Sequence, residues 1–183
     1  MARPRSAVVL DAARTFDAMT RVLFLDIDGV LNSHAYMQKH RAFWDFGDAP
    51  SMLDPDACAR LERVLAATGA AVVISSSWRI CTSLADIRGA IHSRGAPSAR
   101  VIGKTPNPWT GSRRGHEIQR WLDAHDDIDS FAIVDDDADI EHLCARLVQT
   151  HIADGLHPSP RRSIVVSVQR RPTTEPPCRP SPP

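Results

Sequence analysis

The sequence predicts a doubly wound α/β domain, in which a parallel sheet carries helices on both faces. Three apolar runs rich in Val, Ile, Leu and Phe are expected to form strands buried on both faces, as in a parallel sheet. They occupy residues 22–27, 71–74 and 131–134. Stretches with apolar residues at helical spacing lie between them, and strand–helix alternation is typical of a parallel sheet with crossover helices.

Helices are expected in the stretches that separate these strands. The clearest begins at Asp54-Pro55-Asp56, which offers an N-cap, a proline at the first position and an acidic first turn, and it ends at Gly69. Further elements are expected as helices at 84–95, 113–122 and 140–147, and as a short strand at 147–150. Residues 33–52 are expected to form a long polar-aromatic loop, and such loops in compact domains are usually functional or mobile.

Charge and composition divide the chain into three parts. With 22 Lys+Arg and 22 Asp+Glu the formal net charge is zero, yet residues 22–157 alone carry −6. We therefore expect a basic N-terminal arm (1–21), one domain (22–157) and a Pro/Arg-rich tail (158–183). The tail holds eight prolines and is expected to be largely disordered. An acidic domain argues against a protein that coats nucleic acid, and its clustered aspartates indicate a divalent-cation site.

Cysteine usage and hydropathy indicate the compartment. The four cysteines are scattered without a CxxC pair, so no structural zinc is expected at them, and a reducing cytoplasm is the expected location. No apolar run approaches the roughly 20 residues that a membrane helix needs. The apolar run at 7–10 is too short for a signal peptide. No membrane partner is therefore expected.

Each of the three strands ends in a polar cluster. These clusters are Asp26-Ile27-Asp28-Gly29, Ser75-Ser76-Ser77 and Asp135-Asp136-Asp137. The carboxyl ends of neighbouring strands in a doubly wound sheet face one crevice. Alternation places Asp26 and Asp28 on the same side of the chain, and Gly29 permits a sharp turn. Carboxylates this close repel one another unless a cation lies among them, and hard oxygen ligands without Cys or His favour Mg²⁺.

Four segments together resemble a known superfamily. Phe-Leu-Asp-Ile-Asp-Gly-Val-Leu-Asn (24–32) resembles the first motif of the haloacid dehalogenase (HAD) superfamily. Its other three motifs resemble Val-Val-Ile-Ser (72–75), an arginine ahead of a helix, and Ile-Val-Asp-Asp (133–136). A finer pattern is similar to the HAD domain of "Swiss Army Knife" RNA-repair proteins over residues 22–156. It comprises Ser-Ser-Ser-Trp-Arg (75–79), Lys-Thr-Pro (104–106), and the segments 114–122 and 135–139.

The resemblance implies a fold and a reaction. The fold would be HAD-like without a large cap domain, because only 46 residues separate Asp28 from Ser75. The activity would be that of a Mg²⁺-dependent phosphatase working through an aspartyl-phosphate. Asp26 would be the nucleophile, and Asp28 would protonate the leaving oxygen and then activate water. Ser75 or Ser76 would hydrogen-bond the transferring phosphoryl group.

The same resemblance implies the charged partners of the phosphate. Arg114 would neutralise the phosphoryl group, with Arg113 as the alternative and Lys104 as a poorer candidate. Asp136 and Asp135 would hold Mg²⁺ together with the Asp26 carboxylate and the Asp28 carbonyl. Little covalent work would remain for the protein beyond positioning and charge neutralisation.

The sequence is compatible with three functions. The first is removal of phosphate from RNA or DNA ends or from nucleotides, with a repair protein as a possible partner. The second is a small-metabolite phosphatase in which residues 33–52 act as a lid. The third is a non-catalytic phosphate-binding module that recruits partners through its tail. The pair Asp26 and Asp28 argues against the third, because binding phosphate gains little from two further anions.

Several individual residues also have a simpler structural interpretation. A calcium loop at 135–139 is excluded, because its sixth position is Ile140 rather than Gly. A zinc-protease motif at His116 is excluded by Arg120, which stands where the second histidine is required. Trp78 and Trp121 are expected to pack in the core rather than stack on bases. The resemblance implies a further helix beyond residue 156, whereas this chain has a Pro-rich segment there, which would leave an apolar patch for a partner or the tail to cover.

Overall fold

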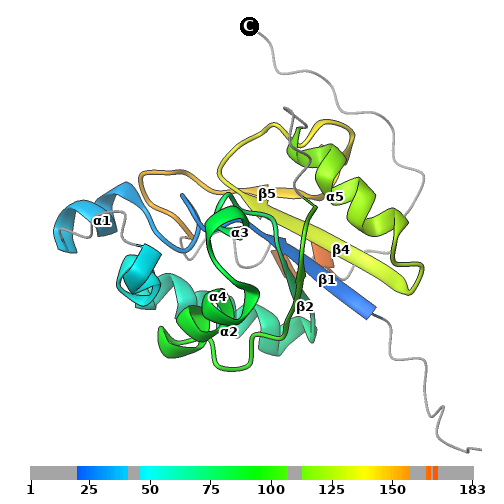
Figure 1. Ribbon diagram of the computed structural model, residues 1–183. Coiled ribbons are helices and arrows are strands. Elements are labelled where there is room, and N and C mark those ends of the chain that lie inside the picture. The colour runs from blue at the N-terminus through cyan, green and yellow to red at the C-terminus, as the bar shows by residue number, and fades with distance from the viewer. Residues whose placement is uncertain (1–19, 41–45, 107–112, 157–163, 166, 169–183) are drawn as a thin grey trace, which may run out of the picture.

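The computed structural model describes residues 20–40, 46–106, 113–156, 164–165 and 167–168, with side chains from 49 onward in the second range. Its centre is an all-parallel, five-stranded sheet with the strand order β3-β2-β1-β4-β5 (Figure 1). The strands are β1 (Thr20–Leu25), β2 (Ala71–Ile74), β3 (Val101–Lys104), β4 (Ile128–Asp135) and β5 (Leu147–Gln149). The predicted doubly wound α/β fold is confirmed.

The apolar runs form the central strands because both faces of the sheet are covered. Along β1, Leu23 and Leu25 face one hydrophobic cluster, whereas Val22 and Phe24 face the other. Helices α2 (Pro55–Thr68) and α4 (Leu84–Ser93) cover the first face, and α5 (Arg114–Asp123) covers the second, as Figure 1 shows. The α/β alternation therefore places helices on opposite sides of one sheet.

The start and end of α2 follow the sequence prediction. The Asp54 carboxylate accepts a hydrogen bond from the Asp56 backbone N–H at 2.8 Å, and Pro55 occupies the first helical position. Gly69 ends the helix with φ +66°, in the left-handed region. The 3₁₀ helix η2 (Glu141–Arg146) occupies the segment where a short helix was predicted.

Four elements differ from the prediction. Residues 33–52 are not a loop throughout, because they contain α1 (His34–His40) and the 3₁₀ helix η1 (Phe46–Met52). No residue of α1 is buried, so its sequence lacks the apolar periodicity from which a helix can be predicted. The helix α3 (Trp78–Cys81) and strand β3 are each only four residues long and were not predicted.

The apolar patch expected beyond residue 156 is covered by residues of the tail. Ile164 and Val168 are 1% and 0% exposed and belong to the hydrophobic cluster that contains Leu156. Residues 164–165 and 167–168 are helical. The expectations for 1–19 and for the rest of the tail fall outside the described residues. Within those residues, no helix has the length and apolar character required to cross a membrane.

Candidate active site

Strand register brings the three polar strand ends together. Leu25 pairs with Ile74 on one side and with Val134 on the other, so the residues that follow lie side by side at the carboxyl edge of the sheet. These residues are Asp26, Ser75 and Asp135. The convergence predicted from the strand order is therefore observed.

Asp26 is a buried carboxylate with two stabilising neighbours. Its side chain accepts a hydrogen bond from Ser76, and its Oδ1 lies 3.9 Å from Arg114 Nη1. Asp26 is 5% exposed, and this burial raises its pKa from 3.8 to about 6, although Arg114 and the Ser76 hydrogen bond oppose the rise. Asp26 is therefore a buried acid whose charged form is stabilised by Arg114 and Ser76.

Asp135 is more deeply buried than Asp26 and less well paired. Its Oδ1 accepts a hydrogen bond from the Asp137 backbone N–H at 3.0 Å, and its Oδ2 lies 3.6 Å from Arg114 Nε. That Oδ2 makes no hydrogen bond within the described residues. Burial, reinforced by the charge of Asp26, raises the pKa of Asp135 to about 7, with Arg114 opposing the rise.

The three carboxylates of Asp26, Asp135 and Asp136 form a cluster that fits a hard divalent cation. Asp26, Asp135 and Asp136 each offer an oxygen atom, and these atoms lie within 4.8 Å of one another. The pKa of Asp136 is also raised, mainly by burial. Three carboxylates face one guanidinium, and Asp135 Oδ2 is buried without a hydrogen bond in the described chain, so a cation would satisfy an otherwise orphaned ligand atom. Oxygen donors alone favour Mg²⁺.

Gly29 brings the loop after β1 against the loop after β4. Its φ is +68°, in the region that favours glycine, and a Cβ at this position would overlap the Asp136 carboxyl group. The Thr150 hydroxyl donates to the Gly29 carbonyl at 2.8 Å and thereby stabilises the turn. A side chain at position 29 would therefore displace Asp136 from its cluster with Asp26 and Asp135.

Asp28 is held apart from the buried carboxylates by three donors. Asn32 Nδ2 and Trp78 Nε1 each donate to its Oδ1 at 3.0 Å, and Ser77 Oγ donates to its Oδ2 at 3.3 Å. Asp28 is half-buried at the mouth of the site. Trp78 packs in the core as predicted, at 1% exposure, but its indole N–H also orients Asp28, a role that the sequence analysis did not foresee.

The two serine candidates occupy different positions. Ser76 hydrogen-bonds to the Asp26 carboxylate, and its Oγ accepts from the Trp78 backbone N–H at 3.4 Å. Ser75 Oγ is buried and has no hydrogen-bond partner in the described part of the chain. Both therefore remain candidates for phosphate binding, Ser76 through its contact with the predicted nucleophile and Ser75 through its unused hydroxyl.

Of the basic candidates, Arg114 is the one that the fold places among the carboxylates. It bridges Asp26 and Asp135 from the first position of α5. Arg113 instead lies toward Glu141, with 3.2 Å between Nη1 and Oε1, and its side chain is 63% exposed. Lys104 Nζ donates to the Arg79 carbonyl at 2.8 Å, whereas the ion pairs of Asp26 and Asp135 within the described residues are with Arg114.

A buried ion pair that the sequence analysis missed links the serine loop to α5. Arg79 Nη2 lies 2.6 Å from Glu117 Oε2, and Arg79 Nη1 donates to the Ser76 carbonyl at 2.6 Å. Burial lowers the pKa of Arg79, and the charge of Glu117 opposes this effect. Glu117 lies one helical turn after Arg114, so the pair fixes Ser76 and the start of α5 relative to each other.

The fold and the carboxylates define the class of protein. An Asp-x-Asp pair at the end of the central strand, a serine loop after β2 and acidic residues after β4 are the arrangement of a HAD-type domain. The family model for the HAD domain in Swiss Army Knife RNA repair proteins matches residues 22–159, and the chain belongs to this family. The HAD superfamily contains hydrolases and phosphatases and generally uses Mg²⁺. No curated protein is similar enough to the chain to count as a match.

Proposed function

We propose that the chain is a Mg²⁺-dependent phosphomonoester hydrolase that removes phosphate from nucleic-acid ends, with Asp26 as its nucleophile. The observation that supports this most strongly is the contrast between two aspartates that are two residues apart. Asp26 is buried beside Arg114, whereas Asp28 lies at the mouth of the site among three hydrogen-bond donors. Two carboxylates in different environments suit two different roles in one reaction.

The reaction would proceed in two displacements. A carboxylate oxygen of Asp26 attacks phosphorus, and the ester oxygen leaves with a proton from Asp28. Asp28, now ionised, removes a proton from a water molecule that attacks the aspartyl-phosphate. This second displacement releases inorganic phosphate, regenerates the Asp26 carboxylate and returns the proton to Asp28.

Charge neutralisation would come from residues fixed before the substrate arrives. Arg114 would lie against the phosphoryl oxygens, and Ser76 or Ser75 would donate a hydrogen bond to them. When bound by Asp26, Asp135 and Asp136, Mg²⁺ would supply further positive charge to the phosphoryl group. The Arg79–Glu117 pair would keep Ser76 and α5 at a constant separation during turnover.

A cleft beside the first motif supports a substrate larger than phosphate itself. It has a volume of about 650 Å³, and its lining includes Ser33, Tyr36, the cationic side chains of Lys39 and Arg94, and three carboxylates, those of Asp54, Asp56 and Asp154. Ser33 follows Asn32, the residue that donates to Asp28, so the cleft adjoins the first-motif loop in sequence. The Tyr36 ring can stack on a base and the exposed Lys39 ammonium can attract a backbone phosphate, whereas the three aspartates would repel one. The family description, which refers to RNA repair, agrees with this choice.

Turnover of a defined substrate panel tests the proposal. The full chain with Mg²⁺ is assayed against oligonucleotides bearing a 3′-phosphate, a 5′-phosphate or a 2′,3′-cyclic phosphate, and against phosphorylated metabolites. We expect the highest kcat/KM on an oligonucleotide end, and no turnover by Asp26→Asn. Higher kcat/KM on a metabolite would favour the metabolite phosphatase. Phosphate binding without any turnover would favour the non-catalytic module.

The cleft provides a second variant for the substrate class. Lys39 is exposed on α1, so Lys39→Ala should leave the fold and the turnover of a small phosphate ester unchanged. It should lower kcat/KM for the oligonucleotide, and the difference should shrink at high salt, because the lost interaction is with the backbone phosphates. An equal loss on both substrates would argue against a nucleic-acid contact at this cleft.

A further inference from the structure

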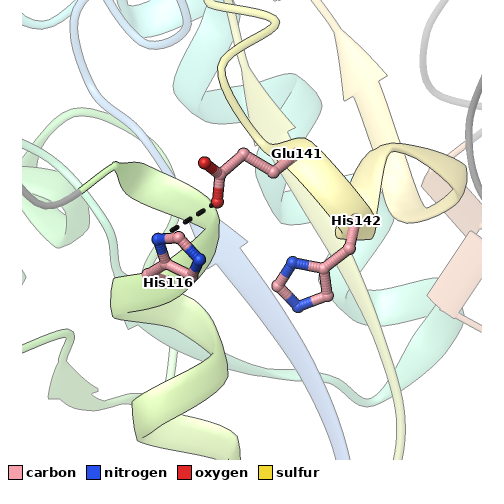
Figure 2. Close-up of side chains that lie close together, drawn as sticks. All are labelled: His116, Glu141 and His142. Atoms are coloured by element: carbon pink, nitrogen blue, oxygen red, sulfur yellow. Dashed lines mark ion pairs between the residues drawn. The ribbon is translucent and has the colours of Figure 1, made fainter. Parts of the chain in front are cut away.

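A second group of metal-ligating side chains lies outside the aspartate site and shares no residue with it. His116 projects from α5, and Glu141 and His142 come from η2, as Figure 2 shows. One ligand atom from each lies within 4.8 Å of the others. His116 Nδ1 and Glu141 Oε2 are 3.2 Å apart. Two ligands of a tetrahedral zinc ion with bonds of about 2.0–2.1 Å are roughly 3.3 Å apart, so this pair already has a suitable spacing.

Hydrogen bonds around His142 leave one ring nitrogen available as a ligand. The Gln119 amide nitrogen donates to Asp123 at 2.7 Å, which turns the Gln119 carbonyl oxygen toward His142 Nε2 at 3.0 Å. Because that oxygen can only accept, Nε2 is the donor, and in the neutral imidazole Nδ1 is then the nitrogen with a free lone pair. Metal-bound histidines in proteins generally donate their other ring N–H in this way, which fixes the ring orientation.

The two carboxylate oxygens of Glu141 have different neighbours. Its Oε1 lies 3.2 Å from Arg113 Nη1, whereas its Oε2 is buried beside His116 and makes no hydrogen bond within the described residues. Glu141 also has a φ of +55°, in the left-handed region that residues other than glycine seldom adopt, and such strained conformations are found more often at functional sites. The oxygen that faces the two imidazoles is therefore the one that lacks a hydrogen bond.

We propose that His116, Glu141 and His142 bind a transition-metal ion, with Zn²⁺ as the best match. Two imidazoles and one carboxylate favour Zn²⁺ over Mg²⁺, so this site and the all-oxygen aspartate site would select different ions. The ion would join α5 to the turn that follows β4. Gly115 packs so closely on the Ile140 carbonyl that a Cβ there would overlap it, and Arg114 immediately precedes Gly115. The bound ion would thus hold the end of α5 from which Arg114 reaches the aspartates.

Cobalt spectroscopy of the full chain tests this site. Co²⁺ is titrated in excess Mg²⁺, which occupies the oxygen site, and Zn²⁺ is then added as competitor. We expect one equivalent of Co²⁺ with visible bands from nitrogen and oxygen ligands, displaced by Zn²⁺. His116→Ala and His142→Ala should each weaken binding at least tenfold, because changes outside the direct ligands already cost 10–100-fold at metal sites. His34→Ala, which removes an exposed histidine of α1, should bind like the wild type.

Melting temperature gives an independent readout. Zn²⁺ should raise the melting temperature of the wild type and of His34→Ala, but not that of His142→Ala. Both ligand imidazoles are exposed, so these variants should keep the circular dichroism of the wild type. Absence of Co²⁺ binding, or equal binding by the wild type and both histidine variants, would overturn the proposal.

Discussion

Replacing Asp135 by Asn should stabilise the protein when no divalent cation is present. The wild-type side chain is fully buried, and burial beside Asp26 raises its pKa from 3.8 to about 7. Asn is neutral at every pH and has nearly the same shape. Its amide oxygen can still accept the hydrogen bond that Asp135 Oδ1 receives from the Asp137 backbone.

The sign and size of the effect follow from the raised pKa. Because its pKa is higher in the folded state, protonated Asp135 stabilises the folded protein. This stabilisation is complete below about pH 3.8 and is lost as the pH rises through about 7. One pKa unit corresponds to about 1.4 kcal/mol, so the loss at about pH 7.5 approaches 4 kcal/mol. Asp135→Asn avoids this loss, and we expect its free energy of unfolding in EDTA to exceed that of the wild type by about 2–4 kcal/mol.

Urea unfolding in EDTA measures the difference, with Asp137→Asn as the matched control. Asp137 is exposed, so its change should alter stability little. The gap between Asp135→Asn and the wild type should narrow toward pH 4–5, where the wild-type carboxyl is protonated. Mg²⁺ should stabilise the wild type but not Asp135→Asn, because the variant lacks a ligand. A variant less stable than the wild type in EDTA at about pH 7.5 would refute this account of the site.

Three further changes test other parts of the structure. Trp78→Phe removes the indole N–H that donates to Asp28. Because a hydrogen bond to a charged group is worth about 1.5–3 kcal/mol, kcat should fall about 10–100-fold in steady-state assays. Glu117→Ala leaves the buried Arg79 guanidinium without its ion pair and should lower the free energy of unfolding in urea by about 3–5 kcal/mol. Deletion of 170–183 should leave the melting temperature and turnover of a small ester nearly unchanged, because a Pro-rich segment supplies little core, and any loss should appear only with polynucleotide at low salt.

Each of these changes has a result that would contradict its premise. For the tryptophan, Trp121→Phe is the control, since it alters the other hydrophobic cluster and should change stability more than kcat. An unchanged kcat in Trp78→Phe would show that its contact with Asp28 does not assist the reaction. A Glu117→Ala variant as stable as the wild type would remove the positioning role assigned to the ion pair. A large fall in melting temperature after the tail deletion would show that the deleted segment is packed.

The parts of the fold that the sequence predicted are those with a local signal. The buried strands and α2 could be read from apolar runs, a capping aspartate and a terminal glycine. Strand β3 was missed because its four residues include Gly103 and show only one buried position, Val101. Helix α1 was missed because it buries no residue.

The candidate site was predictable in its backbone order but not in its side-chain contacts. Three strand ends had to converge in a parallel sheet, so the strand order alone predicts that Asp26 and Asp135 lie together. The choice between Ser75 and Ser76 depends on how the loop leaves β2, which alternation along a strand does not determine. The Arg79–Glu117 pair joins residues 38 positions apart, and no local pattern reveals such a contact.

The most direct test of the proposed mechanism is to trap labelled phosphate on the enzyme. Asp28→Asn keeps Asp26 but lacks the proton donor and the base, so an ester with a good leaving group can phosphorylate Asp26 while hydrolysis of the intermediate is slowed roughly 10²–10⁴-fold. Rapid acid quench of this variant should recover labelled phosphate on Asp26 by peptide mapping. Asp26→Asn, which keeps the shape of the side chain without its nucleophilic anion, should trap none. Wild-type turnover by Asp26→Asn, or label on any other residue, would contradict the assignment of Asp26 as the nucleophile.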